Sequence, residues 1–168
     1  MPTLTIEDGT GVAGANSFAT TAELDTYADN RGLTLPATDD EKKQVLIQAA
    51  DYLESLEGFY QGWRTHETQV LVFPRDSIYL HGVDIEGTIP DVLKNAQCQL
   101  AVDIHGGLAV NQNSTGKEVL EEQVGALKVK YNPMGDSSPQ PKPVKALKIL
   151  EPLFSRATLQ GANARVIR

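Results

Sequence analysis

The stretch AADYLESLEGFYQGWRTHETQVLVFPR, residues 49–75, carries the chain's only tryptophan where a helical pattern gives way to an irregular loop. Trp63 stands between a glycine and an arginine, and the loop ends on an aromatic-Pro-Arg sequence. A large ring can hold such a loop against a helix while nearby guanidinium groups stack or pair. We therefore expect a structural anchor, with Trp63 packed on Tyr52, made of Tyr52, Trp63, Arg64, Phe73 and Arg75. The alternative is an ordinary loop over an ordinary core.

Four segments of the chain have the periodicity of amphipathic helices. Thr20 and Thr38 are each followed three residues later by glutamate, a capping box that predicts a helix start at both positions. Pro90 and Pro143 suit the first turns of two further helices. The expected ends are Asn30-Arg31-Gly32, Gly58, Gly106-Gly107 and, for the last helix, Pro152. The helix after Thr38 has the clearest apolar face, which we expect in the core.

Two short β-hairpins are expected beside these helices. Residues 78–80 and 83–85 are apolar-rich runs around a tight turn. Residues 118–124 and 127–131 flank a glycine, and the second run alternates apolar residues with lysines, which is the period of a half-buried strand. A proline-rich connector follows at residues 132–143.

These elements predict a mainly α fold: a small helical bundle of three to four helices with short β-hairpins and an extended C-terminal tail. At 168 residues the chain can bury a core as one domain, which we place at residues 1–154, with residues 155–168 as the tail. Its apolar runs are far shorter than the roughly 20 residues that cross a bilayer, and it has no signal region at the start. We therefore expect a soluble protein, made in the cytoplasm, without membrane contact.

Charge is distributed unevenly along the chain. Residues 1–138 carry 9 Lys and Arg against 21 Asp and Glu, a net of −12, while residues 139–168 carry 6 against 1, a net of +5. Because phosphate neutralisation needs clustered cations, the acidic body argues against nucleic-acid binding there. The basic end could meet an acidic partner or DNA, or it could simply be a solvated terminus.

The sequence contains no motif that establishes catalysis, cofactor binding or metal binding. Cys98 lies on an apolar helical face, as expected for a buried thiol, and the three histidines lack the spacing of a zinc site. Gly9, Gly11 and Gly14 have the spacing of a dinucleotide-binding loop, but the sequence after them continues as loop instead of opening a helix. Neither a nucleophile elbow nor a Walker A loop occurs. We expect no cofactor, no metal and no enzyme activity, although an enzyme without a motif stays open.

Beyond these local patterns, the chain resembles a family of tailed-bacteriophage neck proteins over residues 1–154. The matching motifs are the Glu-Asp-Gly-Thr-Gly opening, the Ala-x-Asp-Tyr-Leu helix, the Gly-Trp-Arg loop with its Pro-Arg close, and the Ala-x-Cys-x-Leu-Ala helix from Ala96 to Ala101. Members of this family are head-tail connectors, or neck adaptors, and are often labelled DnaT-like single-strand DNA-binding proteins.

The resemblance implies a structural virion protein, assembled in the host cytoplasm, that forms a ring of twelve copies between the portal protein and the tail or next neck protein. DNA would then be contacted only as it passes through the channel. In such rings the C-terminal segment reaches the portal. The portal-binding candidates that the resemblance implies are therefore Lys145, Lys148, Arg156, Arg165 and Arg168.

The alternative reading follows the family's label. In this alternative the chain is a DnaT-like replication protein that binds single-stranded DNA. The bases would then stack on Trp63, Phe73, Tyr79 and nearby arginines. Quenching of the tryptophan fluorescence by an oligonucleotide would favour this alternative over the neck role.

Overall fold

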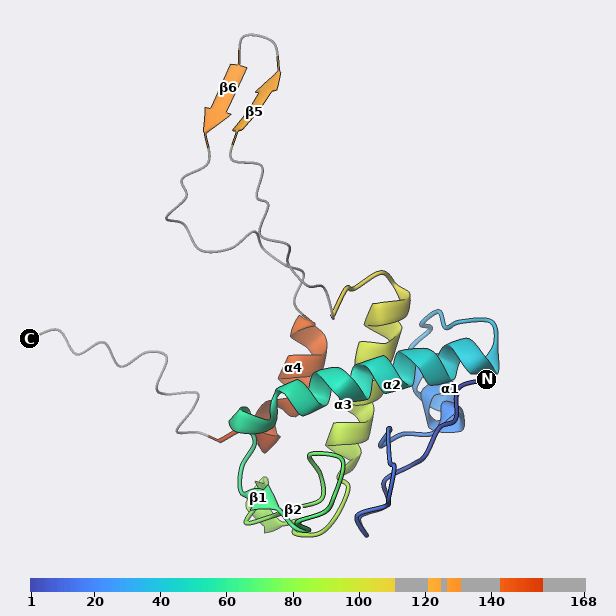
Figure 1. The fold of residues 1–168 in the computed structure, drawn as a ribbon, viewed down its shortest axis with the longest axis vertical. Coiled ribbons are helices and arrows are strands. Elements are labelled where there is room, and N and C mark those ends of the chain that lie inside the picture. The colour runs from blue at the N-terminus through green and yellow to red at the C-terminus, as the bar shows by residue number, and fades with distance from the viewer. Residues whose placement is uncertain (111–120, 125–126, 131–142, 156–168) are drawn as a thin grey trace, which may run out of the picture.

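The computed structural model describes residues 1–110, 121–124, 127–130 and 143–155, which form a helix-rich fold as the sequence predicts (Figure 1). The α-helices of these ranges are α1 (Thr21–Asp29), α2 (Asp39–Ser55), α3 (Asp91–His105) and α4 (Val144–Leu150). α3 is the central helix. It packs against the other three, with α2 across it and with α1 and α4 on opposite sides (Figure 1). No helix of the described ranges is long and apolar enough to span a bilayer.

The first two helices begin where the sequence predicts. The hydroxyl of Thr20 accepts a hydrogen bond from the Glu23 amide at 3.1 Å, and the Glu23 carboxylate accepts one from the Thr20 amide at 2.7 Å. Thr38 and Glu41 repeat this capping box at the start of α2. Each box gives partners to backbone N–H groups that the first helical turn leaves unpaired. The prolines predicted at the other two starts occupy the N-cap positions of α3 and α4.

Buried apolar side chains from all four helices and from the loop after α2 form one core. Cys98 is buried in it, as the sequence predicts. The largest fully buried apolar side chains are Phe18, Phe73, Leu24, Leu46, Leu53, Ile78, Leu93, Leu100, Leu150 and Leu153. Leu150 belongs to α4 and Leu153 to the 3-10 turn η2 (Glu151–Leu153), so part of the basic end of the chain lies in the core.

Residues 143–155 are fastened to the globular body by backbone contacts as well. The Gln61 amide donates to the carbonyl of Leu153 at 3.0 Å, and the Ser155 amide donates to the carbonyl of Phe59 in the turn η1 (Glu57–Phe59) at 2.8 Å. This part of the basic end is therefore packed into the globular body. The apolar side of α4 holds the stretch in place while its lysines face outward. Residues 156–168 lie outside the described residues.

Three two-stranded antiparallel ladders occur in the described ranges. β3 (Tyr79–Leu80) pairs with β4 (Val83–Asp84) across His81-Gly82, whose φ angles of 52° and 84° suit a type I′ turn. β5 (Glu121–Val124) pairs with β6 (Leu127–Lys130), so both predicted hairpins are confirmed. β1 (Trp63–Arg64) pairs with β2 (Arg75–Asp76) and closes the loop between them. The predicted proline-rich connector lies, apart from its last residue, outside the described residues.

Candidate functional site

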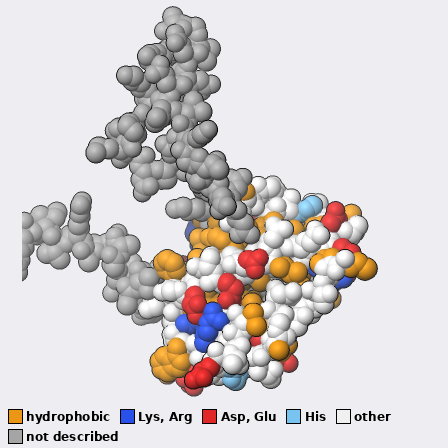
Figure 2. Space-filling view, in the orientation of Figure 1, with side chains coloured by type: hydrophobic (Ala, Val, Ile, Leu, Met, Phe, Trp, Pro, Cys, Tyr) orange, Lys and Arg blue, Asp and Glu red, His pale blue; other side chains and the backbone are white. Residues whose placement is uncertain are grey.

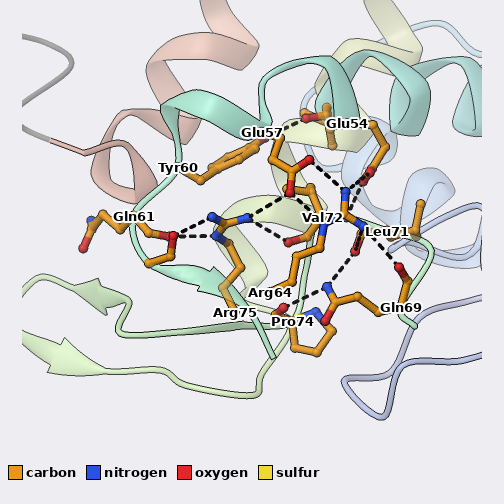
Figure 3. A network of polar contacts seen from close by, with 12 residues as sticks. Glu54, Glu57, Tyr60, Gln61, Arg64, Gln69, Leu71, Val72, Pro74 and Arg75 are labelled. Carbon is orange, nitrogen blue, oxygen red and sulfur yellow. Dashed lines mark hydrogen bonds and ion pairs between the residues drawn. The ribbon is translucent and has the colours of Figure 1, made fainter. Parts of the chain in front are cut away.

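The loop between α2 and β2 is held from the inside by Arg75, which is only 4% exposed (Figure 3). Its Nε donates to the carbonyl of Gln61 at 2.7 Å, its Nη2 to that of Gly62 at 2.7 Å, and its Nη1 to that of Val72 at 3.3 Å. One guanidinium therefore joins the start of the loop to its end. Burial lowers the pKa of Arg75, and the carboxylate of Glu57, 4.0 Å away, opposes that change.

Arg64 fastens the same loop from its outer side (Figure 3). It forms a two-pronged ion pair with Glu57, Nε to Oε1 at 2.6 Å and Nη2 to Oε2 at 2.9 Å, and its Nη1 donates to the carbonyl of Gln69 at 3.1 Å. The hydrogen bond from Arg64 holds the pKa of Glu57 below its ordinary value. Glu54 accepts a hydrogen bond from the far end of the loop, and burial raises the pKa of Glu54. Both arginines are therefore occupied in holding the loop.

The aromatic side chains of this region divide into an inner and an outer set. The inner rings, Tyr60 and Phe73, are 4% and 0% exposed and meet edge to face with their centroids 5.3 Å apart. The outer rings, Trp63 and Tyr79, are 60% and 50% exposed. Trp63 is therefore not the buried anchor that the sequence predicts, and Tyr52, half-buried on α2, does not cover it from solvent. Phe73 and the two arginines are the residues of the predicted anchor that hold the loop.

The strand β1 explains why Trp63 faces outward. Neighbouring side chains of a strand point to opposite faces, so Trp63 must point away from the side on which Arg64 meets its glutamates. The turn before it is equally restricted. Gly62 has a φ of 65°, and a Cβ there would lie 1.8 Å from the carbonyl oxygen of Asp76. Only glycine fits this position, and the turn presents the tryptophan in one direction.

An open groove of about 840 Å³ is lined in part by Tyr79, one of the two outer rings. Its walls come from the β3–β4 turn on one side and from α4 and η2 on the other, and include Tyr79, His81, Lys148, Glu151, Phe154 and Ser155. Gln61 ties the two walls together. Its side-chain nitrogen donates to the carbonyls of Tyr79 at 3.2 Å and Pro152 at 2.9 Å, and its side-chain oxygen accepts from the Tyr79 amide at 3.2 Å. The groove therefore has a fixed shape.

Most cations of residues 1–110 are neutralised by the protein's own carboxylates. Arg64, Arg75 and the lysines of α2 and α3 all lie within 4.0 Å of a carboxylate oxygen. On the face shown in Figure 2, the main group of basic side chains lies directly against acidic ones. Lys145 and Lys148, in contrast, are exposed and have no such partner within the described ranges, and Lys148 lines the groove. The other basic candidates from the sequence, Arg156, Arg165 and Arg168, lie outside the described residues.

The glycine-rich loop near the N-terminus binds a carboxylate of the protein itself. Glu7 is 1% exposed, and its carboxylate accepts hydrogen bonds from the amides of Gly9, Gly11 and Val12, each at 2.9 Å. Backbone N–H groups arranged in this way form an anion site. Because Glu7 fills the site from within, the loop is not open to the phosphate of a nucleotide. In the part of the chain that the structure describes, no group of three or more His, Cys, Asp or Glu side chains could hold a metal ion.

Two residues of the groove have no signal in the sequence that marks them as part of a site. Gln61 has no signal in the sequence, because the residues that it joins are 18 and 91 positions away along the chain. Phe154 is partly buried against Tyr60, with ring centroids 5.4 Å apart, and only the fold brings it into the groove wall. Lys148 does have a sequence signal, since it belongs to the basic end.

The exposed ring of Tyr79 shares a groove with Lys148, which has no carboxylate partner among the described residues. Such a surface belongs to a class that suits single-stranded nucleic acid, because bases stack on rings and phosphates need cations. The family model described as "Putative DnaT-like ssDNA binding protein" matches residues 2–168. The chain belongs to this family. No curated protein and no solved structure matches the chain.

The expectation of a head-tail connector is wrong, because the family that covers the chain is described by single-strand DNA binding. The expected virion role, the portal, tail and neck partners, the ring of twelve copies and the restriction of DNA contact to a channel are overturned with it. The motifs that carry the resemblance explain the error. Gly62 and Arg64 of the Gly-Trp-Arg motif determine how a loop folds, and they contain no information about a partner.

Proposed function

We propose that the protein binds single-stranded DNA along the groove between the β3–β4 turn and η2. The observation that carries the proposal is the exposure of Trp63 and Tyr79 on a hydrogen-bonded support, with Lys148, which has no carboxylate partner within the described ranges, in the same groove as Tyr79. The family description supports it independently. The proposed role is binding alone, without a chemical reaction.

The outer rings are the proposed stacking platforms for bases. A base stacked on an aromatic ring contributes about 1–3 kcal/mol to binding, and because every base has a flat face, such contacts tolerate any sequence. Of the residues in the alternative sequence reading, only Trp63 and Tyr79 can act in this way. Phe73 is fully buried, and the guanidinium groups of Arg64 and Arg75 are occupied by carboxylates and carbonyls.

The lysines of α4 are the proposed phosphate contacts. Lys145 and Lys148 are three residues apart on one helix, so their side chains lie on neighbouring positions of its surface. Because the lysines of residues 1–110 all have carboxylate partners, this part of the chain can neutralise few phosphates. We therefore expect a shallow dependence of affinity on salt, with each phosphate contact adding about 0.7 to the slope of log affinity against log salt.

The same features favour a single strand over a duplex. In a duplex the faces of the bases are stacked on each other and cannot reach the outer rings. A second strand would also bring more phosphates against an acidic body, since residues 1–138 carry a net charge of −12. Like charges at such a surface oppose binding. The protein should therefore prefer unpaired DNA because of both its rings and its charge.

A matched pair of variants in the β3–β4 hairpin tests the proposal. Tyr79→Ala removes a ring from the groove, whereas Val83→Ala shortens a side chain that is 65% exposed and does not line the groove. With a fluorescein-labelled oligothymidylate of about 15 nucleotides, fluorescence anisotropy at low salt should show binding that Tyr79→Ala weakens about tenfold. Val83→Ala should bind as the wild type does.

Two results would contradict the proposal. One is a wild-type protein that binds neither the oligonucleotide nor a matching duplex at low salt. The other is equal affinity of Tyr79→Ala, Val83→Ala and the wild type, which would place any DNA contact outside the groove.

A further inference from the structure

A second concave site lies between α1 and α3, on the side of α3 opposite to α4 (Figure 1). Its volume is about 500 Å³, which is within the range of sites that hold small molecules. The lining residues that matter here are Glu23, Tyr27, Arg31, Asn30, Lys94 and Asn95. None of them lines the groove proposed for DNA.

Arg31 lies over an aromatic ring in this pocket. Its guanidinium carbon lies 3.7 Å from the centroid of the Tyr27 ring, and its Nη1 donates to the carbonyl of Tyr27 at 3.1 Å. The ring itself is fixed, because Tyr27 is 4% exposed and its hydroxyl donates to Gln99 at 3.0 Å. One face of the guanidinium therefore rests on the ring, and the opposite face of this exposed side chain is open.

Arg31 also differs from the other cations of residues 1–110. Every other lysine and arginine in that range has a carboxylate oxygen within 4.0 Å, and Arg31 has none among the residues that the structure describes. A guanidinium group offers five N–H donors, of which the structure uses one here. The pocket therefore has a pre-oriented planar cation with donors to spare.

The edges of the pocket carry side-chain amides. Asn30 and Asn95 both line it, and their amide groups form no hydrogen bond with the described residues. Each amide offers a donor and an acceptor, which is the pairing that the edge of a nucleobase presents, as in the contacts of asparagine with adenine. Lys94 is already paired with Glu23 at 2.8 Å and does not add a free charge.

We infer that this pocket is a nucleobase-binding site, in which a base stacks on the open face of the Arg31 guanidinium and its edge contacts Asn30 or Asn95. Planar guanidinium groups stack on bases in proteins that bind single-stranded nucleic acids. A small multivalent anion fits the pocket less well, because Glu23 and Asp91 also line it and would repel such an ion. A base is neutral and presents a flat face together with a polar edge.

The inference rests in part on the proposed function, because the base can come from two sources. It can belong to a nucleotide of a bound strand that is long enough to reach past the groove, or it can belong to a free nucleotide. The chemistry of recognition is the same in both cases. The test therefore has a strand arm and a free-nucleotide arm.

The deciding variants are Arg31→Ala and Arg31→Lys. Lysine keeps the positive charge but lacks the planar group that stacks on a base. Both variants should therefore lose binding of the base in this pocket to the same extent. Lys43→Ala is the control for net charge, since Lys43 is paired with Asp39 and Asp40 on α2 and lines neither site. Thermal unfolding of each variant checks that the fold is retained. If Arg31→Ala fails this check, Asn95→Ala replaces it.

In the strand arm, labelled oligoadenylates of about 6 and about 30 nucleotides are titrated by anisotropy. Both Arg31 variants should bind the longer strand about tenfold more weakly than the wild type, and the shorter strand equally. In the free-nucleotide arm, saturation-transfer NMR with adenosine monophosphate should show a signal that both variants abolish. A loss in either arm that Arg31→Lys shares with Arg31→Ala supports the site and identifies the source of the base.

The inference is overturned if Arg31→Lys behaves as the wild type in both arms, because charge alone would then explain any loss. It is also overturned if neither Arg31 variant differs from the wild type while Tyr79→Ala still weakens binding. In that case the proposed function stands. A third result separates the two proposals: no oligonucleotide binds, but adenosine monophosphate gives an NMR signal with the wild type that both Arg31 variants abolish. The nucleobase site is then supported and the proposed function fails.

Discussion

The inner and outer rings lie in one short region of the chain and have opposite surroundings. Tyr60 and Phe73 are buried against each other, whereas Trp63 and Tyr79, close to them in sequence, are at least half exposed. The inner rings account for the stability of the loop. The outer rings contribute little to stability and are free to bind. Aromatic residues in one segment can therefore have separate roles, and burial determines which role each one has.

The cations of this region divide in the same way into occupied and available side chains. Arg64 and Arg75 are occupied by Glu57 and by backbone carbonyls, so they stabilise the support of the outer rings and leave no charge for DNA. Lys148 has no partner within the described residues and lies at the groove. Cations available to a ligand are thus found by counting partners and not by counting charges.

The largest effect expected is on the inner rings. Phe73→Ala should lower the free energy of unfolding by about 3–5 kcal/mol, because Phe73 is fully buried and packs edge to face on Tyr60 and Phe18. Urea unfolding followed by circular dichroism measures the change. A loss below about 1 kcal/mol would mean that the inner rings do not hold the loop.

Trp63→Ala should weaken DNA binding and leave stability almost unchanged. Since the side chain is 60% exposed, the free energy of unfolding should change by no more than about 0.5 kcal/mol, while affinity for a labelled oligothymidylate falls about tenfold. Val70→Ala, which shortens a 50% exposed side chain in the same loop, is the control and should alter neither quantity. If Trp63→Ala destabilises the protein as much as Phe73→Ala does, the division into two sets is wrong.

Lys148→Ala should change the salt dependence of binding. Removing one phosphate contact should reduce the slope of log affinity against log salt by about 0.7. Lys43→Ala removes a lysine that is already paired with carboxylates and should leave the slope unchanged. Titrations at three or more salt concentrations measure both slopes. Identical slopes for the two variants would mean that Lys148 does not contact a phosphate.

The smallest effect expected is the pH dependence of the Glu57–Arg64 pair. In the folded protein the hydrogen bond from Arg64 holds the pKa of Glu57 below its ordinary value of 4.5. The stabilisation is therefore complete above pH 4.5 and is lost as the pH falls through the lower, folded pKa. Because the pair is partly exposed, wild type should exceed Glu57→Gln by only about 0.5 kcal/mol at pH 7. Urea unfolding at several pH values measures the difference in the free energy of unfolding between the wild type and Glu57→Gln. If that difference does not shrink towards pH 3, the Glu57–Arg64 pair is not its source.

Local signals in the sequence predict much of the fold. The capping boxes at Thr20 and Thr38 place two helix starts correctly, because a cap depends only on residues three positions apart. The turn His81-Gly82 places a hairpin for the same reason. The pairing of β1 with β2 has no signal in the sequence. Each strand has only two residues, which is too short for an alternating pattern, and the paired Arg64 and Arg75 are eleven positions apart.

The site is less accessible to prediction than the fold. The sequence predicts that Trp63 packs on Tyr52, but the direction of Trp63 depends on the turn at Gly62 and on the glutamates that pair with Arg64. Gln61 joins walls that meet only after α4 has packed on α3. Exposure and partners are properties of the assembled fold, so residue type alone misassigns the tryptophan and the arginines.

The most direct test of this account is the intrinsic fluorescence of Trp63, the chain's only tryptophan, during titration of the wild-type protein with unlabelled oligothymidylate at low salt. We expect saturable quenching, because a base stacks on the exposed ring, and much weaker quenching by the matching duplex at the same nucleotide concentration. Unchanged tryptophan fluorescence at concentrations where anisotropy shows that the oligonucleotide is bound would contradict the claim that the outer rings form the binding surface.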